Sequence, residues 1–501
     1  MRTMLQALAA TANIVSVAAV RAPPACDQAQ VTAAQQLIDR VLGGGGSAES
    51  FALSCSNLEE RHEGGSFPSF VLHASPAGGP IAISGSSGVA LASGFHWYLK
   101  HSCNVSLLYG HQSIAKAAIP STWPAVPTTV SMESPVQWQY YMNVCTHSYS
   151  AAWWDWERWQ TEIDWMAMMG INLPLAFTGQ EFVWDKVYRE TFGLSRADMD
   201  AHFAGPAFLA WGRMGNIRGW GGVYESAGIT GLTPHWMEAQ RQMQKQIVAR
   251  ERSLGMRTVL PAFAGHVPLA LPAKYPGTKM GNNPCWGASG FTGNRWSCDG
   301  LLDAADPKFT QIAEAFMIAQ KEEYGSDGIY NGDTFNEMAA SGNITEWGSG
   351  VYSAMAKADA DATWFIQGWS LNGWPTEQLN AYFSGIPAGG LLSLELSCVT
   401  SSSSFLKFTS QLSPPRPVIC GLLDNMGGRR SLSGSLGTIA SQPLANVVKA
   451  GSTQDGQALL AGIGWNPEDL HSNPVKWQLL GEVGWRNRDH AIADIGQWVD
   501  G

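Results

Sequence analysis

The sequence predicts an α/β fold, a (β/α)8 TIM-type barrel preceded by a small α/β domain. Two observations support this prediction. From about residue 135, short apolar runs alternate with longer helical segments, which indicates a parallel sheet. About eight such runs occur, and no GxGxxG or P-loop motif favours an open, doubly wound sheet instead. The 501 residues suffice for a barrel of roughly 250–400 residues and a smaller domain.

The first 130 residues are expected to contain a leader and the small domain. In residues 1–22, Arg2 precedes an apolar stretch with small-residue cleavage sites, which is typical of a secretory signal peptide; a transit peptide is the alternative. Residues 23–130 are expected to form the N-terminal α/β domain, with helices at 33–42 and 88–98 and strands at 70–72 and 81–84. Prolines mark the linker at its end: Pro120, Pro124 and Pro127.

Residues 131–486 are expected to form the barrel. Strands are predicted at 137–143, 171–177, 258–262, 328–330, 363–367, 391–394, 418–422 and 461–464. Helices are predicted at 153–169, 233–254, 307–323 and 350–359. The first helix has Asp155 as a candidate N-cap, Gly170 at its C-terminal end and one apolar stripe, formed by Trp156, Trp159, Ile163 and Met166.

Composition and charge exclude several classes of partner. The formal net charge is −10 and the pI is about 5.6, which argues against nucleic acid and anionic membranes. No segment is long and apolar enough to span a bilayer. Charged residues make up only 14%, whereas Trp occurs 22 times; besides filling cores, flat indole faces stack on sugar rings. The sequence therefore favours a carbohydrate partner, and a homo-oligomer is compatible with it.

The cysteines do not indicate a metal site, because they form no CxxC pair and no His stands at ligand spacing; neither a metal nor a cofactor is expected. Cys285 and Cys298 flank a Gly-rich loop, where a disulfide and two free thiols are both compatible with the sequence. Asn104 and Asn343 begin N-glycosylation sequons, which matter only in a secreted chain.

The most informative polar segment is Tyr330–Met338, which follows the predicted strand at 328–330. It presents Asn336 and Glu337 at the carboxyl end of a strand, where a barrel of this type carries its chemistry. A Glu can protonate a leaving glycosidic oxygen, and the Asn can hold a sugar hydroxyl. The segment therefore predicts a glycosidase proton donor at Glu337, with a solvated loop Glu as the simpler alternative.

Other predicted strands also end in polar and aromatic residues. Examples are Asn143–Tyr149, Thr178–Glu181, Phe263–His266, Gly368–Trp369 and Trp465–Asp469. Because the carboxyl ends of parallel barrel strands meet at one face, this layout is typical of a deep sugar pocket.

Several of these segments resemble the α-N-acetylglucosaminidases of glycoside hydrolase family 89. They stand in family order and are rich in rare residues, at 140–146, 148–150, 153–156, 162–167, 170–173, 205–216, 260–268 and 333–338. The resemblance covers about residues 65–490 and implies a small α/β domain, a (β/α)8 barrel and a C-terminal all-helical domain. It also implies release of terminal α-linked N-acetylglucosamine with retention, from heparan sulfate-type or similar glycans, in the lysosome, the vacuole or outside the cell.

The family pattern also assigns expected roles to individual residues. Glu337 is expected to be the general acid/base and Glu468 the nucleophile. Retaining hydrolysis needs two such carboxyls about 5–5.5 Å apart, the first protonated and the second ionised. Five residues match positions that line the N-acetylglucosamine pocket: Asn143, Cys145, Tyr149, Trp211 and Trp369.

Three departures from the family pattern bear on the expected activity. Asp469 follows Glu468 where the family usually has Gly, and Asp424 precedes a loop that reads Asn425–Arg429 here. The chain ends at Gly501, so residues 487–501 are expected to be the start of a truncated helical C-terminal domain. A catalytically impaired sugar-binding homologue is therefore one alternative, and a retaining glycosidase of another sugar preference is a second.

Other polar residues at the strand ends have competing interpretations. Glu181 is an alternative catalytic carboxylate or a helix-start residue, and Asp333 either orients the Glu337 loop or stabilises a turn. His147 and His266 can bind a substrate hydroxyl or be structural. A thiol-nucleophile role for Cys145 is rejected, because glycoside hydrolysis does not require one.

Overall fold

The structure, a computed structural model, describes residues 22–44, 47–56, 67–107, 119–220, 232–281, 299–340, 342–400, 407–429, 434–450, 459–471, 473–486 and 491–500. The predicted signal peptide, apart from Ala22, lies outside the described residues. So do Cys285 and Cys298, for which a disulfide and two free thiols are both compatible with the sequence. Within these ranges, no helix has the length and apolar character that crossing a membrane requires.

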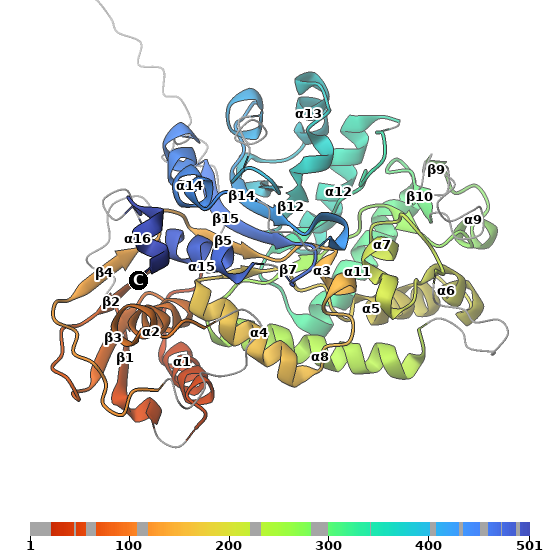
Figure 1. Cartoon of the computed structure of the whole chain (residues 1–501). Coiled ribbons are helices and arrows are strands. Elements are labelled where there is room, and N and C mark those ends of the chain that lie inside the picture. The colour runs from red at the N-terminus through yellow and green to blue at the C-terminus, as the bar shows by residue number, and fades with distance from the viewer. Residues whose placement is uncertain are drawn as a thin grey trace, which may run out of the picture.

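A small four-stranded sheet and two helices form the N-terminal part of the described chain (Figure 1). Strands β1 (Phe51–Cys55), β2 (Ser69–Leu72), β3 (Ile81–Gly85) and β4 (Val130–Glu133) lie in the order β1-β3-β2-β4. Only β1 and β3 are parallel; β2 is antiparallel to both of its neighbours. Helices α1 (Gln28–Val41) and α2 (Gly88–Cys103) pack against this sheet. The sequence does not predict β1 and β4, because alternation over four or five residues is too short to distinguish from a loop.

The predicted barrel is confirmed. Its eight parallel strands are β5 (Trp138–Tyr141), β6 (Leu173–Pro174), β7 (Val259–Pro261), β11 (Ile329–Asn331), β12 (Thr363–Gln367), β13 (Leu391–Glu395), β14 (Val418–Asp424) and β15 (Leu460–Pro467). They lie in the order β6-β5-β15-β14-β13-β12-β11-β7. A parallel bridge between Leu175 and Val259 closes the ring. All eight fall on predicted strands, because a strand buried on both faces reads as a continuous apolar run.

Helices surround the barrel (Figure 1). The longer ones are α4 (Trp156–Met169), α8 (Pro234–Ser253), α11 (Pro307–Tyr324), α12 (Ile344–Ala358), α14 (Leu436–Ala450) and α15 (Pro474–Val483). α4 begins three residues later than predicted because the Asp155 side chain accepts a hydrogen bond from the backbone N–H of Arg158. It ends at Gly170, whose φ of 92° only Gly adopts easily. α12 begins earlier than predicted, where Asn343 caps it.

Shorter helices and strands lie in the connections between the barrel strands. They are the helices α3 (Thr146–Tyr149), α5 (Gln180–Lys186), α6 (Arg196–His202), α7 (Leu209–Arg213), α9 (Leu271–Lys274) and α13 (Thr376–Phe383), and the antiparallel strands β8 (His266–Val267), β9 (Met280–Gly281) and β10 (Gly300–Leu302). The last described element is α16 (Ile495–Asp500). Because α3 follows β5, and α5 and α7 lie in the connection that follows β6, these helices bring their side chains to the face where chemistry is expected.

A buried charge cluster joins the small domain to the barrel. Asp164 of α4 accepts hydrogen bonds from Arg40 of α1, at 2.7 and 2.9 Å, and from Arg250 of α8, at 2.8 Å. The Asp164 side chain is only 7% exposed. One carboxylate therefore compensates two guanidinium groups at the junction of three helices.

Replacing Asp164 with Ala is expected to lower the free energy of unfolding by about 3–5 kcal/mol, because both arginines then lose their buried partner. Urea unfolding followed by circular dichroism measures the change. Glu238→Ala is the matched control: Glu238 pairs with Arg241 in the exposed part of α8, and its loss should cost about 0–1 kcal/mol. Equal effects of the two substitutions would contradict the prediction.

His96 of α2 makes the same interface sensitive to acid. Burial, followed by the nearby charges of Lys100 and His101, lowers the pKa of His96 from 6.5 to about 3. Below pH 6.5, His96 is protonated in the unfolded chain but stays neutral in the folded chain. The free energy of unfolding therefore declines as the pH falls, until the pH reaches about 3. The contribution is at most about 1.4 kcal/mol per pH unit. In thermal melts across this range, His96→Gln should flatten the decline, whereas the exposed His235→Gln should leave it unchanged.

Candidate active site

Glu337 lies in the loop that follows β11, at the carboxyl end of the barrel strands. Its side chain is exposed and its backbone is left-handed, with φ 52°, which is uncommon for a Glu. The amide nitrogen of Asn216 donates a hydrogen bond of 2.7 Å to Oε2 of Glu337. Asn336 in turn donates to Oδ1 of Asn216, at 3.3 Å. Two buried asparagines thus hold one oxygen of the carboxyl group in place.

Asp333 fixes the start of the same loop. Its carboxylate accepts hydrogen bonds from the backbone N–H and the side-chain amide of Gln367, both at 2.9 Å, and from Asn331 at 3.1 Å. Gln367 ends the neighbouring strand β12, so Asp333 joins two adjacent strand ends. Burial raises the pKa of Asp333, while these hydrogen bonds lower it. Of the two predicted roles, this arrangement favours orientation of the Glu337 loop.

Glu468 follows β15, which lies four positions from β11 in the barrel, with β12, β13 and β14 between them. Oε2 of Glu468 accepts a hydrogen bond of 2.5 Å from the backbone N–H of Gly427, and its own N–H donates to the carbonyl of Asp424 at 2.9 Å. Burial raises the pKa of Glu468; the Gly427 N–H lowers it, and the charge of Glu337 raises it.

The charges of Glu337 and Glu468 both affect the pKa values of Cys145 and Tyr149. Burial raises the pKa of the Cys145 thiol well above its usual value, and the charges of Glu468 and Glu337 add to this effect. Burial raises the pKa of Tyr149 to about 12, with further contributions from Cys145, Glu468 and Glu337. Electrostatic effects of this kind require short separations. The two carboxyl groups therefore lie within electrostatic range of the two predicted pocket residues.

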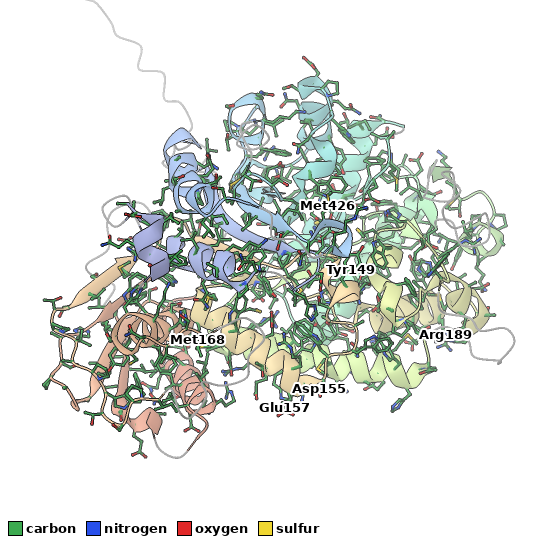
Figure 2. All side chains as sticks on the ribbon, in the orientation of Figure 1. Tyr149, Asp155, Glu157, Met168, Arg189 and Met426 are labelled. Atoms are coloured by element: carbon green, nitrogen blue, oxygen red, sulfur yellow. A yellow bond between two sulfur atoms is a disulfide. The ribbon has the colours of Figure 1, made fainter. Side chains whose placement is uncertain are left out.

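Tyr149 and Trp211 form an aromatic pair, which we call the aromatic wall. Their rings meet edge to face with centroids 5.2 Å apart. Tyr149 also contacts Gly428, where an added Cβ would lie 2.6 Å from the ring. Figure 2 shows Tyr149 and Met426, two partly exposed side chains, on the same side of the barrel. The wall thus draws on the loops that follow β5 and β14, as well as on α7.

The remaining predicted pocket residues occupy different positions. Asn143 is buried and accepts a hydrogen bond from the N–H of Cys145 at 2.8 Å, which shapes the turn after β5. Trp369 stands at the end of β12 with 37% of its surface exposed. His147 is buried between the rings of Trp159 and Phe177, with centroids 6.0 and 6.3 Å away, which favours its structural interpretation.

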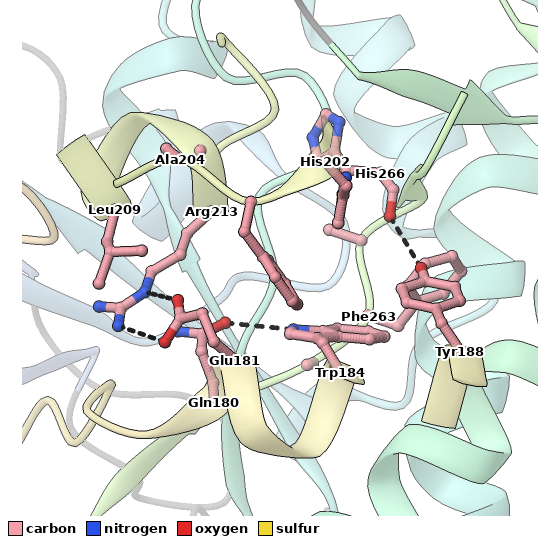
Figure 3. Close-up of a pocket in the computed structure, with 14 residues that line it drawn as sticks. Gln180, Glu181, Trp184, Tyr188, His202, Ala204, Leu209, Arg213, Phe263 and His266 are labelled. Carbon is pink, nitrogen blue, oxygen red and sulfur yellow. Dashed lines mark hydrogen bonds and ion pairs between the residues drawn. The ribbon is translucent and has the colours of Figure 1, made fainter. Parts of the chain in front are cut away.

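His266 lines a cavity together with residues of α5 and α7, shown in Figure 3. An added Cβ on Gly215 would lie 2.1 Å from the His266 ring, so the two residues are in tight contact. Burial lowers the pKa of His266 to about 4. Glu181 lines the same cavity and forms a buried bidentate ion pair with Arg213, at 2.7 and 3.0 Å. This pair engages Glu181 and anchors the segment that leads to Asn216.

Sequence reasoning missed Asn216 and Gly427 as site residues. Asn216 lies within one of the family-like segments but has no local signal of a role, and Gly427 acts through its backbone. Within the described ranges, no group of three or more His, Cys, Asp or Glu is arranged to hold a metal ion.

Comparisons with known proteins identify the family to which the chain is similar. Residues 139–487 match the family described as "Alpha-N-acetylglucosaminidase (NAGLU) tim-barrel domain", and residues 32–125 match the corresponding N-terminal domain. The human protein named alpha-N-acetylglucosaminidase is 36% identical over 506 aligned residues, covering 98% of this chain and 63% of the human protein.

Solved structures give the same picture. A family 89 glycoside hydrolase from Clostridium perfringens, in complex with PUGNAc, superimposes with a TM-score of 0.80 at 26% identity, covering 94% of this chain and 50% of that chain. A variant of that enzyme has been solved with its substrate, GlcNAc-α-1,4-galactose. A family 20 exo-β-N-acetylglucosaminidase from Vibrio harveyi shares the fold alone, with a TM-score of 0.54 at 10% identity, covering 94% of this chain and 70% of that chain. The chain thus spans half to two thirds of the length of its nearer relatives named here.

Proposed function

Since the chain belongs to the α-N-acetylglucosaminidase family, glycoside hydrolase family 89, we propose that it removes terminal, non-reducing α-linked N-acetylglucosamine from glycans with retention of configuration. Glu337 is the general acid/base and Glu468 the nucleophile. The observation that supports this proposal most directly is the pair of carboxyl groups at the ends of β11 and β15. The charge of Glu337 contributes to the raised pKa of Glu468, and the charges of both contribute to the raised pKa values of Cys145 and Tyr149.

The proposed reaction has two steps. In the first, Glu337 gives its proton to the glycosidic oxygen while Glu468 attacks the anomeric carbon, so the bond to the leaving group breaks and a glycosyl ester forms. In the second, Glu337 takes a proton from water, which attacks the same carbon and releases Glu468. Each inversion reverses the other, which leaves the product with the α configuration of the substrate. Tyr149 and Trp211 offer aromatic surface on which the sugar ring can rest.

The proposed nucleophile sets the acidic side of the pH dependence. Attack requires ionised Glu468, and burial together with the charge of Glu337 raises the pKa of this carboxyl group. The ratio kcat/KM should therefore fall as the pH decreases through a value above the ordinary range of a glutamate. Measuring kcat/KM for an aryl α-N-acetylglucosaminide across the acidic range tests this. A decline that begins only below that ordinary range would contradict it.

Turnover of 4-nitrophenyl α-N-acetylglucosaminide by the purified chain tests the activity, and proton NMR of the first product formed tests retention. The α-glucoside without the acetamido group is the matched substrate, and faster hydrolysis of it would favour another sugar preference. Calorimetric binding of N-acetylglucosamine without turnover would instead support a sugar-binding homologue.

We also infer a location in the secretory pathway, in the lysosome or vacuole or outside the cell. The disulfides Cys26–Cys55 and Cys398–Cys420 support this location, because disulfides persist in oxidising compartments. Both sequon asparagines, Asn104 and Asn343, are exposed. A shift in electrophoretic mobility on treatment with an N-glycosidase, after expression in a eukaryotic host, is the measurement that checks it.

A further inference from the structure

The loop after β14 has an unusual backbone. Three of its four residues are left-handed: Asn425 with φ 53°, and Gly427 and Gly428 with φ 67° each. Asn and Gly are the residues that adopt this conformation at least cost. The loop turns back over the end of β15 and directs the N–H of Gly427 at Oε2 of Glu468. We call Asn425–Gly428 the clamp loop.

The clamp loop is anchored on the segment that contains Glu468. The Asn425 side chain donates hydrogen bonds to the carbonyls of Asp469, at 2.7 Å, and His471, at 3.2 Å. Directly before the loop, Asp424 forms a buried ion pair of 2.5 Å with Lys476 of α15. Buried groups therefore hold the start of the clamp loop in place relative to the segment that contains Glu468.

The two glycines of the clamp loop serve different purposes. Gly428 makes room for Tyr149, as described above. At Gly427, an added Cβ would meet no described atom within 4 Å, so space does not explain the glycine. The left-handed backbone of Gly427 explains the glycine, and this backbone directs its N–H at the carboxylate of Glu468.

We infer that Gly427 is a positioning residue for the nucleophile: its left-handed backbone N–H holds Oε2 of Glu468 so that the carboxylate is ionised and directed at the anomeric carbon. This inference rests on the proposed function, which assigns the nucleophile to Glu468. It extends that function by naming the group that holds the carboxylate.

Gly427 acts among several other charged and titratable groups near Glu468. They come from the connections after β5 and β11, from the end of β14, from the Glu468 segment and from α15: Cys145, Tyr149, Glu337, Asp424, Asp469, His471 and Lys476. Asp424 with Lys476 and Asp469 with His471 are paired with each other. Since none of these groups belongs to Gly427, a substitution there removes no charged or titratable side chain and is expected to act through the hydrogen bond to Glu468.

Three variants test the inference. Gly427→Ala puts a Cβ on a left-handed residue and is expected to displace the N–H, lowering kcat/KM by about ten- to a hundredfold. The acidic limb of the kcat/KM profile should move up by about one pH unit, while the alkaline limb stays in place. Gly427→Asn should recover most of the loss, because Asn tolerates this backbone. Gly277→Ala is the control, since Gly277 is also left-handed, with φ 93° and open space, but lies outside the site.

The outcomes separate this inference from the proposed function. If Gly427→Ala leaves both kcat/KM and the acidic limb unchanged while Glu468→Ala is inactive, the positioning role is wrong and the nucleophile stands. An unselective loss, equal for Ala and Asn with no shift of the acidic limb, would also overturn the role. If Glu468→Ala keeps its activity, the proposed function itself fails. Thermal midpoints of Gly427→Ala and Gly277→Ala, compared with each other, show whether backbone strain alone explains the change.

Discussion

Replacing Glu337 with Gln is expected to reduce kcat/KM about 10²- to 10⁴-fold for α-N-acetylglucosaminides whose leaving group is an alcohol, because no acid remains to protonate the glycosidic oxygen. A 2,4-dinitrophenyl glycoside needs no such proton, so its first step should be nearly unaffected. Gln keeps the size of the side chain and an oxygen that can accept the hydrogen bond from Asn216, which separates proton transfer from packing. Steady-state kinetics on the two substrates measure the difference.

A smaller variant and a control complete this experiment. Glu337→Ala with added azide should give the α-glycosyl azide, because azide replaces water in the second step and attacks the covalent intermediate. Glu377→Gln, an exposed glutamate at the start of α13, should leave both rates unchanged. Equal losses on the alcohol and dinitrophenyl substrates, or a β-azide, would refute the acid/base role of Glu337.

Replacing Glu468 with Ala is expected to reduce turnover by roughly 10⁵-fold or more, the scale seen when other covalent enzymes lose their nucleophile. Azide should restore activity and yield the β-glycosyl azide, since it enters the space left by the carboxylate and inverts the anomeric carbon once. NMR of the azide product gives its configuration. The opposite configurations expected from Glu337→Ala and Glu468→Ala assign the two roles independently of the rates.

Glu181 provides a matched test of the alternative carboxylate. It is buried and bound to Arg213, so Glu181→Gln should destabilise the chain and slow catalysis only through the segment that leads to Asn216. Azide should not rescue this variant. Rescue with formation of a single azide anomer would transfer the nucleophile role to Glu181.

Much of the fold could be predicted because its signals are local. The barrel strands are continuous apolar runs, and all eight were recognisable from a few consecutive residues, such as Thr363–Gln367. The α4 boundaries were less certain. The stripe that includes Trp159 and Ile163 predicts the helix, but its first residue depends on the Asp155 cap. The short strands β1 and β4 form because they pair with β3 and β2, respectively, and no local sequence pattern predicts this pairing.

In the candidate site, local signals identify individual residues, whereas the partners of these residues depend on folding. The segment around Glu337 and the family-like motifs identify which carboxyl groups and aromatic rings to consider. They do not show that Asn336 gives its amide to Asn216, or that Glu181 is engaged by Arg213. The Asn336–Asn216 contact joins the connections that follow β11 and β6, so its partners are brought together only when the barrel closes. Glu181 and Arg213 lie 32 residues apart in the one connection that follows β6, and the folding of that connection brings them together.

Local sequence patterns predict the strand and helix alternation, the barrel, and the positions of Glu337 and Glu468 at strand ends. These properties follow from periodicity and from short motifs, which depend on neighbours in the chain. The groups that hold the two carboxyl groups emerge from the folded structure alone: Asn216, 121 residues before Glu337, and Gly427, 41 residues before Glu468. A hydrogen bond depends on the distance and angle between its two groups in space, and the spacing of residues so far apart along the chain does not predict either quantity.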